Sequence, residues 1–194
     1  MNDNLAYAED SFREPYREEL IGGKWVAMAP ATMSHNFVTS NIYFLFADYL
    51  RDKQCTPISD GAALYLSDDD FFIPDFMLVC APDKIKWDGV HGAPDLVAEV
   101  LSPGTVRNDR GRKMRMYASS GVREYWLVNP ADKVVEQYLL REGSFELYNS
   151  YALRPERELA RMKPEELAAI QTEFKCSLYD DLTIRLADIF RRVP

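Results

Sequence analysis

The sequence predicts a mixed α/β domain in which a sheet is flanked by helices, and three stretches carry this prediction. Apolar residues recur every three or four positions between 34 and 50, which is the period of an amphipathic helix. Residues 71–80 are apolar on both alternating faces, as in a central strand that is covered on both sides. Residues 95–102 form another apolar run, which Pro103 and Gly104 end before a basic helical stretch.

Length and composition are those of one soluble globular domain, which we place over residues 1–194. A chain of 194 residues buries roughly 70% of the surface that it exposes when unfolded, and 47% of its residues are hydrophobic. No apolar run approaches the ~20 residues of a membrane span, and the N-terminus lacks a signal core, so we expect a cytoplasmic protein. The net charge of −8 excludes a protein that coats nucleic acid with its whole surface, but not one with a single basic face.

The three cysteines, Cys55, Cys80 and Cys176, are expected to be reduced and partly buried. They are far apart in the sequence, odd in number, and lack the Cys-x-x-Cys spacing or the paired histidines of a zinc site. The sequence therefore predicts neither a disulfide framework nor a zinc site.

The N-terminal part of the chain is expected to hold a hairpin and the first helix. Residues 1–18 are polar and acidic, which favours a loose or short helical lead-in. Residues 19–28 predict two short strands about a Gly-Gly turn, because glycines accept the positive φ of a tight hairpin. Thr32 or Ser34 can cap the helix that follows.

His35 stands on the apolar stripe of this helix, one turn from its start. A hydrogen-bonded histidine at the margin of the core is one interpretation, since His is often partly buried. Participation in a site where this helix end meets the sheet is the other.

Two strands are predicted next, over residues 63–66 and 71–80. Asp75 falls in the middle of the second strand, where an unpaired carboxylate is costly. Pro74 removes one hydrogen-bond donor from the sheet, so we expect a bulge or a local end of pairing there.

The second half of the chain continues the alternation of strands and helices. The predicted elements are a loop at 81–93, a strand at 95–102, a helix at 106–119 closed by Gly121, a strand at 124–128, a hairpin of 133–140 with 145–148, and a sheet-edge strand with a short helix within 177–190. Residues 154–175, dense in helix formers, predict an inserted helical arm in which Pro155 and Pro164 each begin a short helix. A solvated surface is the ordinary interpretation of the arm, and a lid or a dimer contact is the alternative.

Glu99 needs a partner from outside its own strand. Asp95 shares its face but lies about 13 Å away at ~3.3 Å per residue, too far for both to hold one metal ion. Asp75, halfway along the expected antiparallel neighbour, is the best candidate. Two buried carboxylates repel each other unless a proton or cation neutralises them, and oxygen ligands suit Mg²⁺ or Mn²⁺. Lys113 can then orient an attacking water and stabilise charge on a phosphoryl group.

A basic stretch surrounds Lys113 in this acidic chain. Within residues 105–115 only Asp109 opposes the basic residues, which are Arg107, Arg110, Arg112, Lys113 and Arg115. A solvated helix face is the ordinary interpretation, but the position directly after Glu99 gives equal weight to a phosphate-binding patch.

A series of motifs occurs in a fixed order along the chain: Glu19-Leu-Ile-Gly-Gly-Lys-Trp-Val-Ala-Met, Ile-Pro-Asp75-Phe, Pro-Asp95-Leu-Val-Ala-Glu99-Val-Leu-Ser-Pro, Asp109, Lys113, Tyr117 and Gly121-Val-Arg-Glu-Tyr-Trp-Leu-Val. This series resembles the Uma-type family of bacterial endonucleases within the PD-(D/E)XK nuclease superfamily. It covers about residues 15–150 and the final strand and helix, but not the arm.

The resemblance implies a restriction endonuclease-like α-β-β-β-α-β core and a Mg²⁺- or Mn²⁺-dependent endonuclease that hydrolyses DNA. It makes Asp75 and Glu99 the metal ligands and catalytic acids, with Lys113 as the catalytic lysine and His35 as a further candidate. The superfamily's lysine ordinarily stands two residues after the second acid, where this chain has Leu101.

The resemblance also implies DNA as the partner, held by a patch of four arginines, Arg107, Arg110, Arg112 and Arg115. A symmetric homodimer would suit cleavage of both strands of a duplex. The alternative is a catalytically weak or inactive nuclease-fold protein with a binding or regulatory role, which the net charge and Leu101 favour. A hydrolase of another phosphodiester would share the same site.

Overall fold

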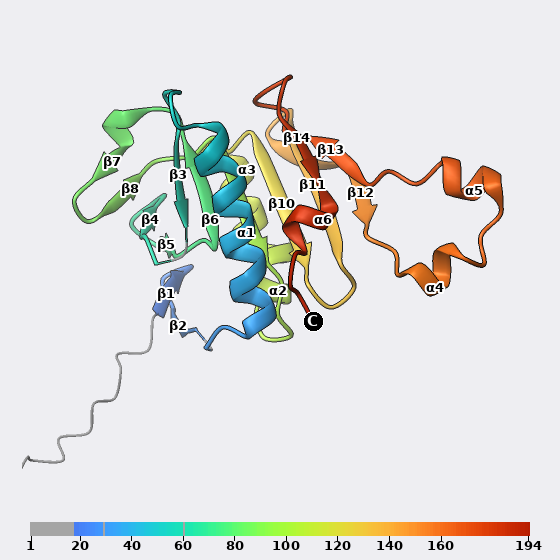
Figure 1. The fold of residues 1–194 in the computed structure, drawn as a ribbon. Helices are drawn as coiled ribbons and strands as arrows, with labels where there is room; N and C mark the ends of the chain where they lie inside the picture. The colour runs from blue at the N-terminus through green and yellow to red at the C-terminus, as the bar shows by residue number, and fades with distance from the viewer. Residues whose placement is uncertain (1–17, 29, 60) are drawn as a thin grey trace, which may run out of the picture.

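The computed structural model describes residues 18–28, 30–59 and 61–194, so the predicted lead-in lies almost wholly outside the described residues. A six-stranded mixed sheet, in the order β12-β11-β10-β9-β6-β3, forms the centre of the described chain (Figure 1). Its strands are β3 (Thr56–Ser59), β6 (Phe76–Val79), β9 (Leu96–Val100), β10 (Glu124–Asn129), β11 (Val134–Arg141) and β12 (Ser144–Ala152). Strands β9 and β10 are parallel, whereas β6 and β9 are antiparallel as predicted.

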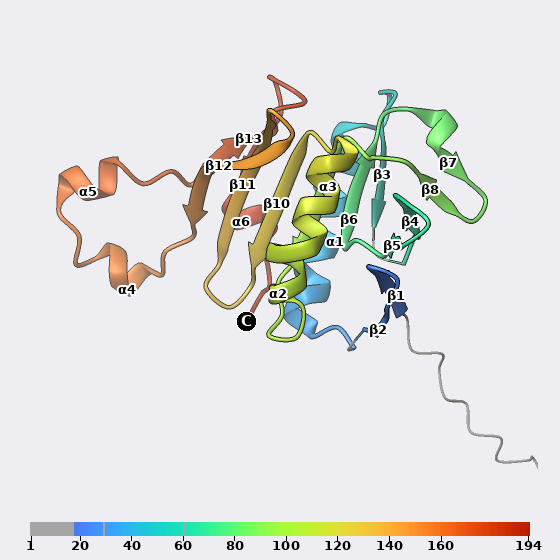
Figure 2. The same cartoon turned by 180° about the vertical axis from the view of Figure 1, so that it is seen from behind.

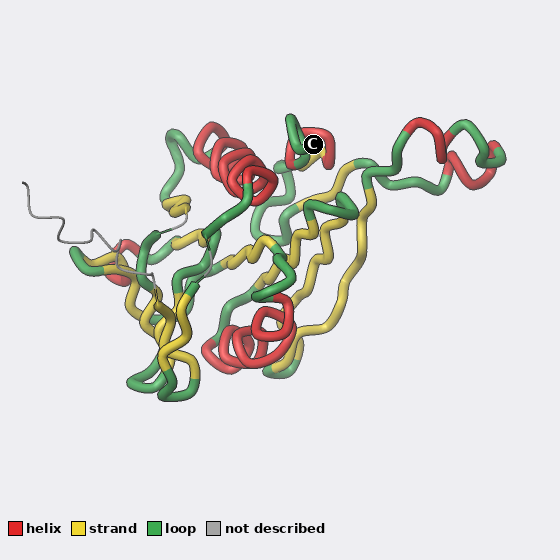
Figure 3. The backbone as a smooth tube through the Cα atoms, turned by 90° about the horizontal axis from the view of Figure 1, so that it is seen from below, coloured by secondary structure: helices red, strands yellow, loops and turns green. Residues whose placement is uncertain are grey.

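Helices cover both faces of this sheet, which confirms the predicted fold class (Figures 1 and 2). Helix α1 (Met33–Tyr49) lies on one face with α6 (Leu186–Ile189), and the Asn41 amide donates to the Ile189 carbonyl at 2.9 Å. The Thr32 side chain caps α1 by accepting from the His35 N–H. Viewed from below in Figure 3, the other helical segment lies across the sheet from α1.

That other segment is not the single regular helix predicted over 106–119. It consists of α2 (Val106–Asn108), a π-helical turn η2 (Asp109–Lys113) and α3 (Met114–Ser120). Gly121 closes it, as predicted, with a φ of 93°. The wider turn points Asp109 and Lys113 into the protein, and π-helical turns of this kind are frequent at functional sites.

A second six-stranded sheet, in the order β2-β1-β5-β4-β8-β7, packs beside the first. Its strands are β1 (Glu18–Ile21), β2 (Trp25–Ala27), β4 (Leu64–Tyr65), β5 (Asp70–Phe72), β7 (Ile85–Lys86) and β8 (Gly89–His91). The predicted hairpin of β1 and β2 is confirmed. The segment predicted as a loop at 81–93 also contains η1 (Pro82–Lys84), β7 and β8. These elements were not predicted because two or three residues are too few to show a periodic pattern in the sequence.

The strand predicted over 71–80 is divided between the two sheets. Residues before Ile73 form β5 in the second sheet, and residues after Asp75 form β6 in the central one. The predicted end of pairing at Pro74 is thus confirmed. Asp75 therefore lies where the chain passes from the second sheet to the central sheet, which we call the crossing point of the two sheets. Its side chain is buried there, but the residue itself belongs to neither β5 nor β6.

The C-terminal part departs from the prediction in two respects. The arm holds α4 (Glu156–Leu159) and α5 (Pro164–Ala168), with Pro155 preceding α4 as its cap, and it ends before β13 (Glu173–Lys175). Strand β14 (Thr183–Arg185) pairs with β13 in a separate two-stranded sheet, not with the central sheet. The arm projects beyond β12, away from β1 and β2, a position that does not support its role as a lid (Figures 1 and 2).

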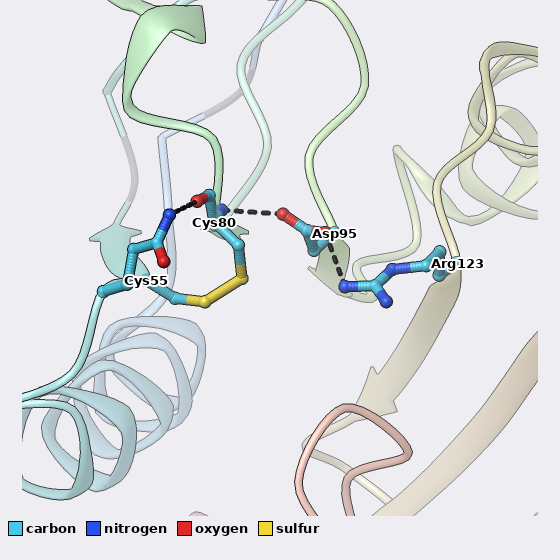
Figure 4. Close-up of a disulfide and its surroundings, with 5 residues drawn as sticks. Cys55, Cys80, Asp95 and Arg123 are labelled. Carbon is cyan, nitrogen blue, oxygen red and sulfur yellow. Dashed lines mark hydrogen bonds and ion pairs between the residues drawn. A yellow bond between two sulfur atoms is a disulfide. The ribbon is translucent and has the colours of Figure 1, made fainter.

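Cys55 and Cys80 form a disulfide, so the prediction of reduced thiols is wrong for these two residues (Figure 4). The register that pairs Thr56 of β3 with Val79 of β6 places the two cysteines opposite each other, a proximity that spacing in the sequence does not reveal. Cys176 is free and buried. Among the described helices, none is long and apolar enough to cross a membrane.

Reduction of this disulfide is expected to lower the free energy of unfolding by about 3 kcal/mol, because the bond closes a chain segment of 25 residues. For a domain of this size the melting temperature should fall by roughly 6–12 °C. Thermal melts with and without dithiothreitol measure the change, and Cys55→Ser with Cys80→Ser serves as the control that no longer responds to reductant. Equal melting temperatures for oxidised and reduced protein would contradict the prediction.

Candidate active site

The three predicted site residues, Asp75, Glu99 and Lys113, come together at the crossing of the two sheets. Asp75 directly precedes β6, Glu99 lies on the adjacent β9, and Lys113 reaches them from η2. All three are buried, with exposed fractions of 6%, 2% and 3%. The antiparallel pairing of β6 with β9 brings the two acids together, and the π-helical turn turns the lysine toward them.

Glu99 is held by two side chains from the helical segment. Its Oε1 accepts hydrogen bonds from Tyr117 Oη at 2.7 Å and from Lys113 Nζ at 3.1 Å. Among the described residues, its Oε2 accepts one long hydrogen bond of 3.4 Å, from the Asp75 N–H. One carboxylate oxygen is therefore fixed in place, and the other faces Asp75.

Asp75 is fixed from the opposite side. Its Oδ2 accepts from the Val100 N–H at 2.6 Å, and its Oδ1 lies 3.0 Å from His35 Nε2. The structure therefore places His35, at the start of α1, directly against the first acid. The site residues described so far come from α1, β9, η2, α3 and the residue before β6, so Asp75 and Glu99 meet although they are far apart in the sequence.

Lys113 is surrounded by three acids, and the sequence analysis assigned only Glu99 of these to the site. Its Nζ lies 2.8 Å from Glu19 Oε1, 3.1 Å from Glu99 Oε1 and 3.5 Å from Asp109 Oδ1. Glu19 also accepts from the Ile73 N–H at 2.9 Å, which ties β1 to the crossing point. The sequence offered one indication that Glu19 belongs to the site. Glu19 lies on the inward face of the predicted strand β1, between the exposed Glu18 and the half-buried Leu20.

The site carries more negative than positive charge. Four carboxylates, those of Glu19, Asp75, Glu99 and Asp109, face one lysine and His35. Burial raises the pKa of Glu99 well above its usual range, against the attraction of Lys113, and repulsion by Asp75 and Asp109 raises it further. Burial alone would lower the pKa of Lys113, but the surrounding carboxylates outweigh it and raise that pKa, so the amine stays protonated at neutral pH.

Glu99 should give stability a pH dependence of definite sign. Its pKa is higher in the folded protein than the value of about 4.3 for an unfolded chain. The folded state therefore binds this proton more tightly, and stability falls as pH rises from about 4.3 through the folded pKa. We expect metal-free Glu99→Gln to be about 1–2 kcal/mol more stable than the wild type at pH 7 and equally stable at pH 4.

Urea unfolding at the two pH values in EDTA measures this difference. Glu124→Gln is the matched control, because Glu124 is also a buried glutamate but accepts from neutral donors, Trp126 Nε1 at 2.6 Å and Gln137 Nε2 at 2.7 Å. We expect that variant to be less stable at pH 7. A Glu99→Gln protein that is also less stable at pH 7 would assign Glu99 a structural role.

Two carboxylates are the direct candidates for a metal ion at this site. Within the described ranges, no group of three or more His, Cys, Asp and Glu side chains is arranged to hold a metal by itself. Asp75 and Glu99 together offer hard oxygen donors, and Mg²⁺ is typically bound by one or two carboxylates with phosphate and water completing its shell. The excess of negative charge also fits a divalent cation.

Comparison with known proteins assigns the family. The sequence model of Uma2, described as "Putative restriction endonuclease", matches residues 3–172. The chain belongs to the Uma2 family. This confirms the predicted resemblance. The match includes most of the arm, which the resemblance was not expected to cover, but it ends before the final strand and helix, which the resemblance was expected to include.

Relatives of this Uma2 chain include two proteins of Synechocystis sp. It is 28% identical to slr1290 over 134 residues, which cover 68% of this chain and 70% of that protein. It is 27% identical to sll1609 over 126 residues, or 63% and 71% of the two chains. A crystal structure of a "putative nuclease belonging to DUF820" from Anabaena variabilis shares the fold, with a TM-score of 0.62 and 17% identity over 89% of both chains.

Two of the four arginines predicted to bind DNA are already paired in this Uma2 chain. Arg112 forms two hydrogen bonds with Asp70, of 2.9 and 3.0 Å, and Arg110 forms two with Glu136, of 2.7 and 2.9 Å. Arg107 and Arg115 are exposed. Only these last two offer their charge directly to a phosphate, and their role in DNA binding stays a prediction.

The pairing of Arg112 with Asp70 fixes the hairpin beside the site. Asp70 also accepts from the Gly22 N–H at 3.0 Å. A Cβ on Gly22, whose φ is 63°, would lie 2.6 Å from the Arg112 guanidinium, so this turn requires glycine. The arginine therefore positions β1, the strand that carries Glu19.

Asp95 and Leu101 lie where the sequence analysis of this Uma2 chain placed them. Asp95 precedes β9 at the end remote from Glu99, where it accepts from the Cys80 N–H at 2.7 Å and from Arg123 at 2.6 Å (Figure 4). Leu101 packs against the apolar cluster on the Glu99 side of the sheet. Leu101, at the position where the superfamily usually has its lysine, carries no charge. The positive charge next to Glu99 comes from Lys113 instead.

Proposed function

We propose that this protein is a metal-dependent nuclease that hydrolyses phosphodiester bonds of DNA. The observation that carries the proposal is the convergence of Asp75, Glu99 and a protonated Lys113 from three different elements. Membership of a family whose model is described as "Putative restriction endonuclease" supports the substrate class.

Asp75 and Glu99 would hold Mg²⁺ or Mn²⁺. The two acids are close enough to repel each other and lie at a place with surplus negative charge, and their oxygens are the ligand type that these ions prefer. When bound, such an ion polarises the phosphoryl oxygen and lowers the pKa of an attacking water.

Lys113 acts as a fixed positive charge in this proposal. Its raised pKa makes it a poor general base at neutral pH, whereas its ammonium can stabilise the negative charge that develops on the phosphoryl group. The three surrounding carboxylates hold Nζ in place, and Tyr117 and His35 orient the two acids. Preorganised charge of this kind is effective because it needs no rearrangement during the reaction.

Cleavage of both strands of a duplex would favour a symmetric homodimer with one site for each strand. The arm is the candidate for the dimer contact. The exposed Arg107 and Arg115 are the candidates for binding the phosphates of the DNA backbone.

The test is cleavage of supercoiled plasmid and of single-stranded DNA during a titration with Mg²⁺ or Mn²⁺, with Ca²⁺ and EDTA as controls. We expect cleavage only with Mg²⁺ or Mn²⁺, and a rise in melting temperature as the metal binds. The absence of cleavage with either metal would favour the second candidate, an inactive binding or regulatory protein. That candidate is supported by the nearly complete burial of Glu99 and Lys113 and by the ion pairs that Lys113 already makes.

A further inference from the structure

The outer face of the second sheet carries a row of aromatic side chains that the proposed chemistry does not use. Strand pairing aligns Trp25 with Leu20, Leu20 with Phe71, Phe71 with Tyr65, and Tyr65 with His91. These five residues come from β2, β1, β5, β4 and β8. They therefore form one line across the sheet, which we call the aromatic row.

The rings of the aromatic row contact one another in sequence. Ring centroids lie 6.2 Å apart for Trp25 and Phe71, 5.2 Å for Phe71 and Tyr65, and 4.6 Å for Tyr65 and His91. Both ends are open to solvent, since Trp25 is 63% exposed and His91 is also exposed, and the rings between them are half-buried. A connected strip of partly exposed rings is unusual on a soluble surface and indicates a binding face.

The aromatic row lies back to back with the candidate active site. Side chains of a strand alternate between faces, so Leu20 points outward while its neighbour Glu19 points inward to Lys113. On β5, Phe71 points outward, and its neighbours Asp70 and Phe72 are buried. The same short sheet therefore supports the site with one face and presents the aromatic row with the other.

Two lysines flank the aromatic row. Lys24 precedes Trp25, and Lys86 of β7 is paired with Gly89 two residues from His91. Both are exposed, and neither forms an ion pair with any other residue in the described part of the chain. This distinguishes them from Arg110 and Arg112, whose charges are compensated. The aromatic row thus combines partly exposed rings with a lysine near each end, and at the His91 end the Asp88 carboxylate lies 3.1 Å from His91 Nε2.

We propose that the aromatic row binds an unpaired segment of a DNA strand by stacking with its bases, while Lys24 and Lys86 contact its phosphates. Aromatic side chains on an open sheet are a general means of binding unstacked bases, because every base has a π-face. The proposal rests on the proposed function for its substrate class. It adds that the nuclease engages DNA where the bases are unpaired, through a face separate from the one that holds the acids.

The test is the affinity of the whole protein for a fluorescein-labelled 12-nucleotide single strand, measured by anisotropy in EDTA so that no metal-dependent cleavage occurs. We expect Trp25→Ala and Tyr65→Ala each to weaken binding about tenfold, and duplex of the same sequence to bind more weakly than the single strand. Phe44→Ala and Tyr148→Ala are the matched controls, because these rings are 68% and 65% exposed but lie on α1 and β12. Both controls should bind as the wild type does.

A second measurement addresses the lysines. For single strands the logarithm of affinity falls with the logarithm of salt concentration by about 0.7 for each phosphate contact. Combined Lys24→Ala and Lys86→Ala should therefore reduce that slope by about 1.4, and an unchanged slope would remove both lysines from the interface.

Three outcomes would overturn the proposal: unchanged single-strand affinity in Trp25→Ala and Tyr65→Ala, equal or tighter binding of duplex, or a concentration-dependent dimer that Trp25→Ala dissociates. The last would assign the row to a second copy of the chain. Failure of the nuclease proposal is distinguishable, because it would leave single-strand binding in EDTA intact while no metal restores cleavage. Conversely, if the protein cleaves DNA but its affinity for a single strand does not depend on the aromatic row, the nuclease proposal stands and the proposal for the aromatic row is wrong.

Discussion

Asp75→Asn is expected to lower metal-dependent DNA cleavage by about a thousandfold. A catalytic metal contributes several kcal/mol to transition-state stabilisation, and each 1.36 kcal/mol corresponds to a tenfold change in rate. Asparagine preserves the shape of the side chain and can still accept from the Val100 N–H, so the fold should persist. The rate of plasmid nicking at saturating Mg²⁺ measures the loss of catalysis. The metal-induced shift in melting temperature measures the loss of metal binding.

Asp95→Asn provides the control for this experiment. Each of the two aspartates follows a proline and precedes a strand of the central sheet, but Asp95 binds Arg123 and the Cys80 N–H at the remote end of β9. We expect Asp95→Asn to cleave DNA at the wild-type rate. If Asp75→Asn retained cleavage, or if Asp95→Asn lost it equally, the assignment of the metal to Asp75 and Glu99 would be wrong.

Lys113→Met is expected to lower the free energy of unfolding by about 3–5 kcal/mol, which is the usual cost of leaving buried charges without their partner. Glu19, Glu99 and Asp109 would then face one another with no cation among them. The melting temperature should fall by roughly 6–20 °C for a domain of this size. The loss should be smaller at pH 4–5 than at pH 7, because protonation of these acids removes their repulsion.

Two further variants separate this effect from a general loss of packing. Lys133→Met removes a lysine whose Nζ donates to the Val193 carbonyl and forms no ion pair with a described residue, and it should cost much less stability. Adding Glu19→Gln to Lys113→Met should restore part of the lost stability, a coupling that a double-mutant cycle measures directly. Additive effects of the two substitutions would show that the ion pair between them contributes little.

Addition of Mg²⁺ gives an independent view of the same charge balance. If Asp75 and Glu99 bind the ion, Mg²⁺ should stabilise the wild type and have little effect on either single-acid variant. Stability and catalysis would then report on one set of residues through two unrelated measurements.

Local sequence was sufficient for much of the fold. The period of residues 34–50, the glycine turn of the first hairpin and the position of Gly121 each depend on short-range backbone preferences, and the structure confirms all three. The pairing of Asp75 with Glu99 was also accessible, because an acid inside an apolar strand requires a partner on the neighbouring strand. Elements of two or three residues, such as β7 and β8, leave no period in the sequence and were missed.

By itself, the sequence determined which residues are chemically out of place, namely acids within apolar strands and a proline before one of them. The resemblance to the family added that its usual lysine is replaced by Leu101. Only the tertiary structure decided what surrounds them. Glu99 and Glu124 are both buried glutamates, yet acids crowd the first and neutral donors satisfy the second. The disulfide, the inclusion of Glu19 and the line of rings on the second sheet depend on register between distant strands. The physical reason is that a strand fixes the spacing of its own side chains, whereas their partners are set by long-range pairing.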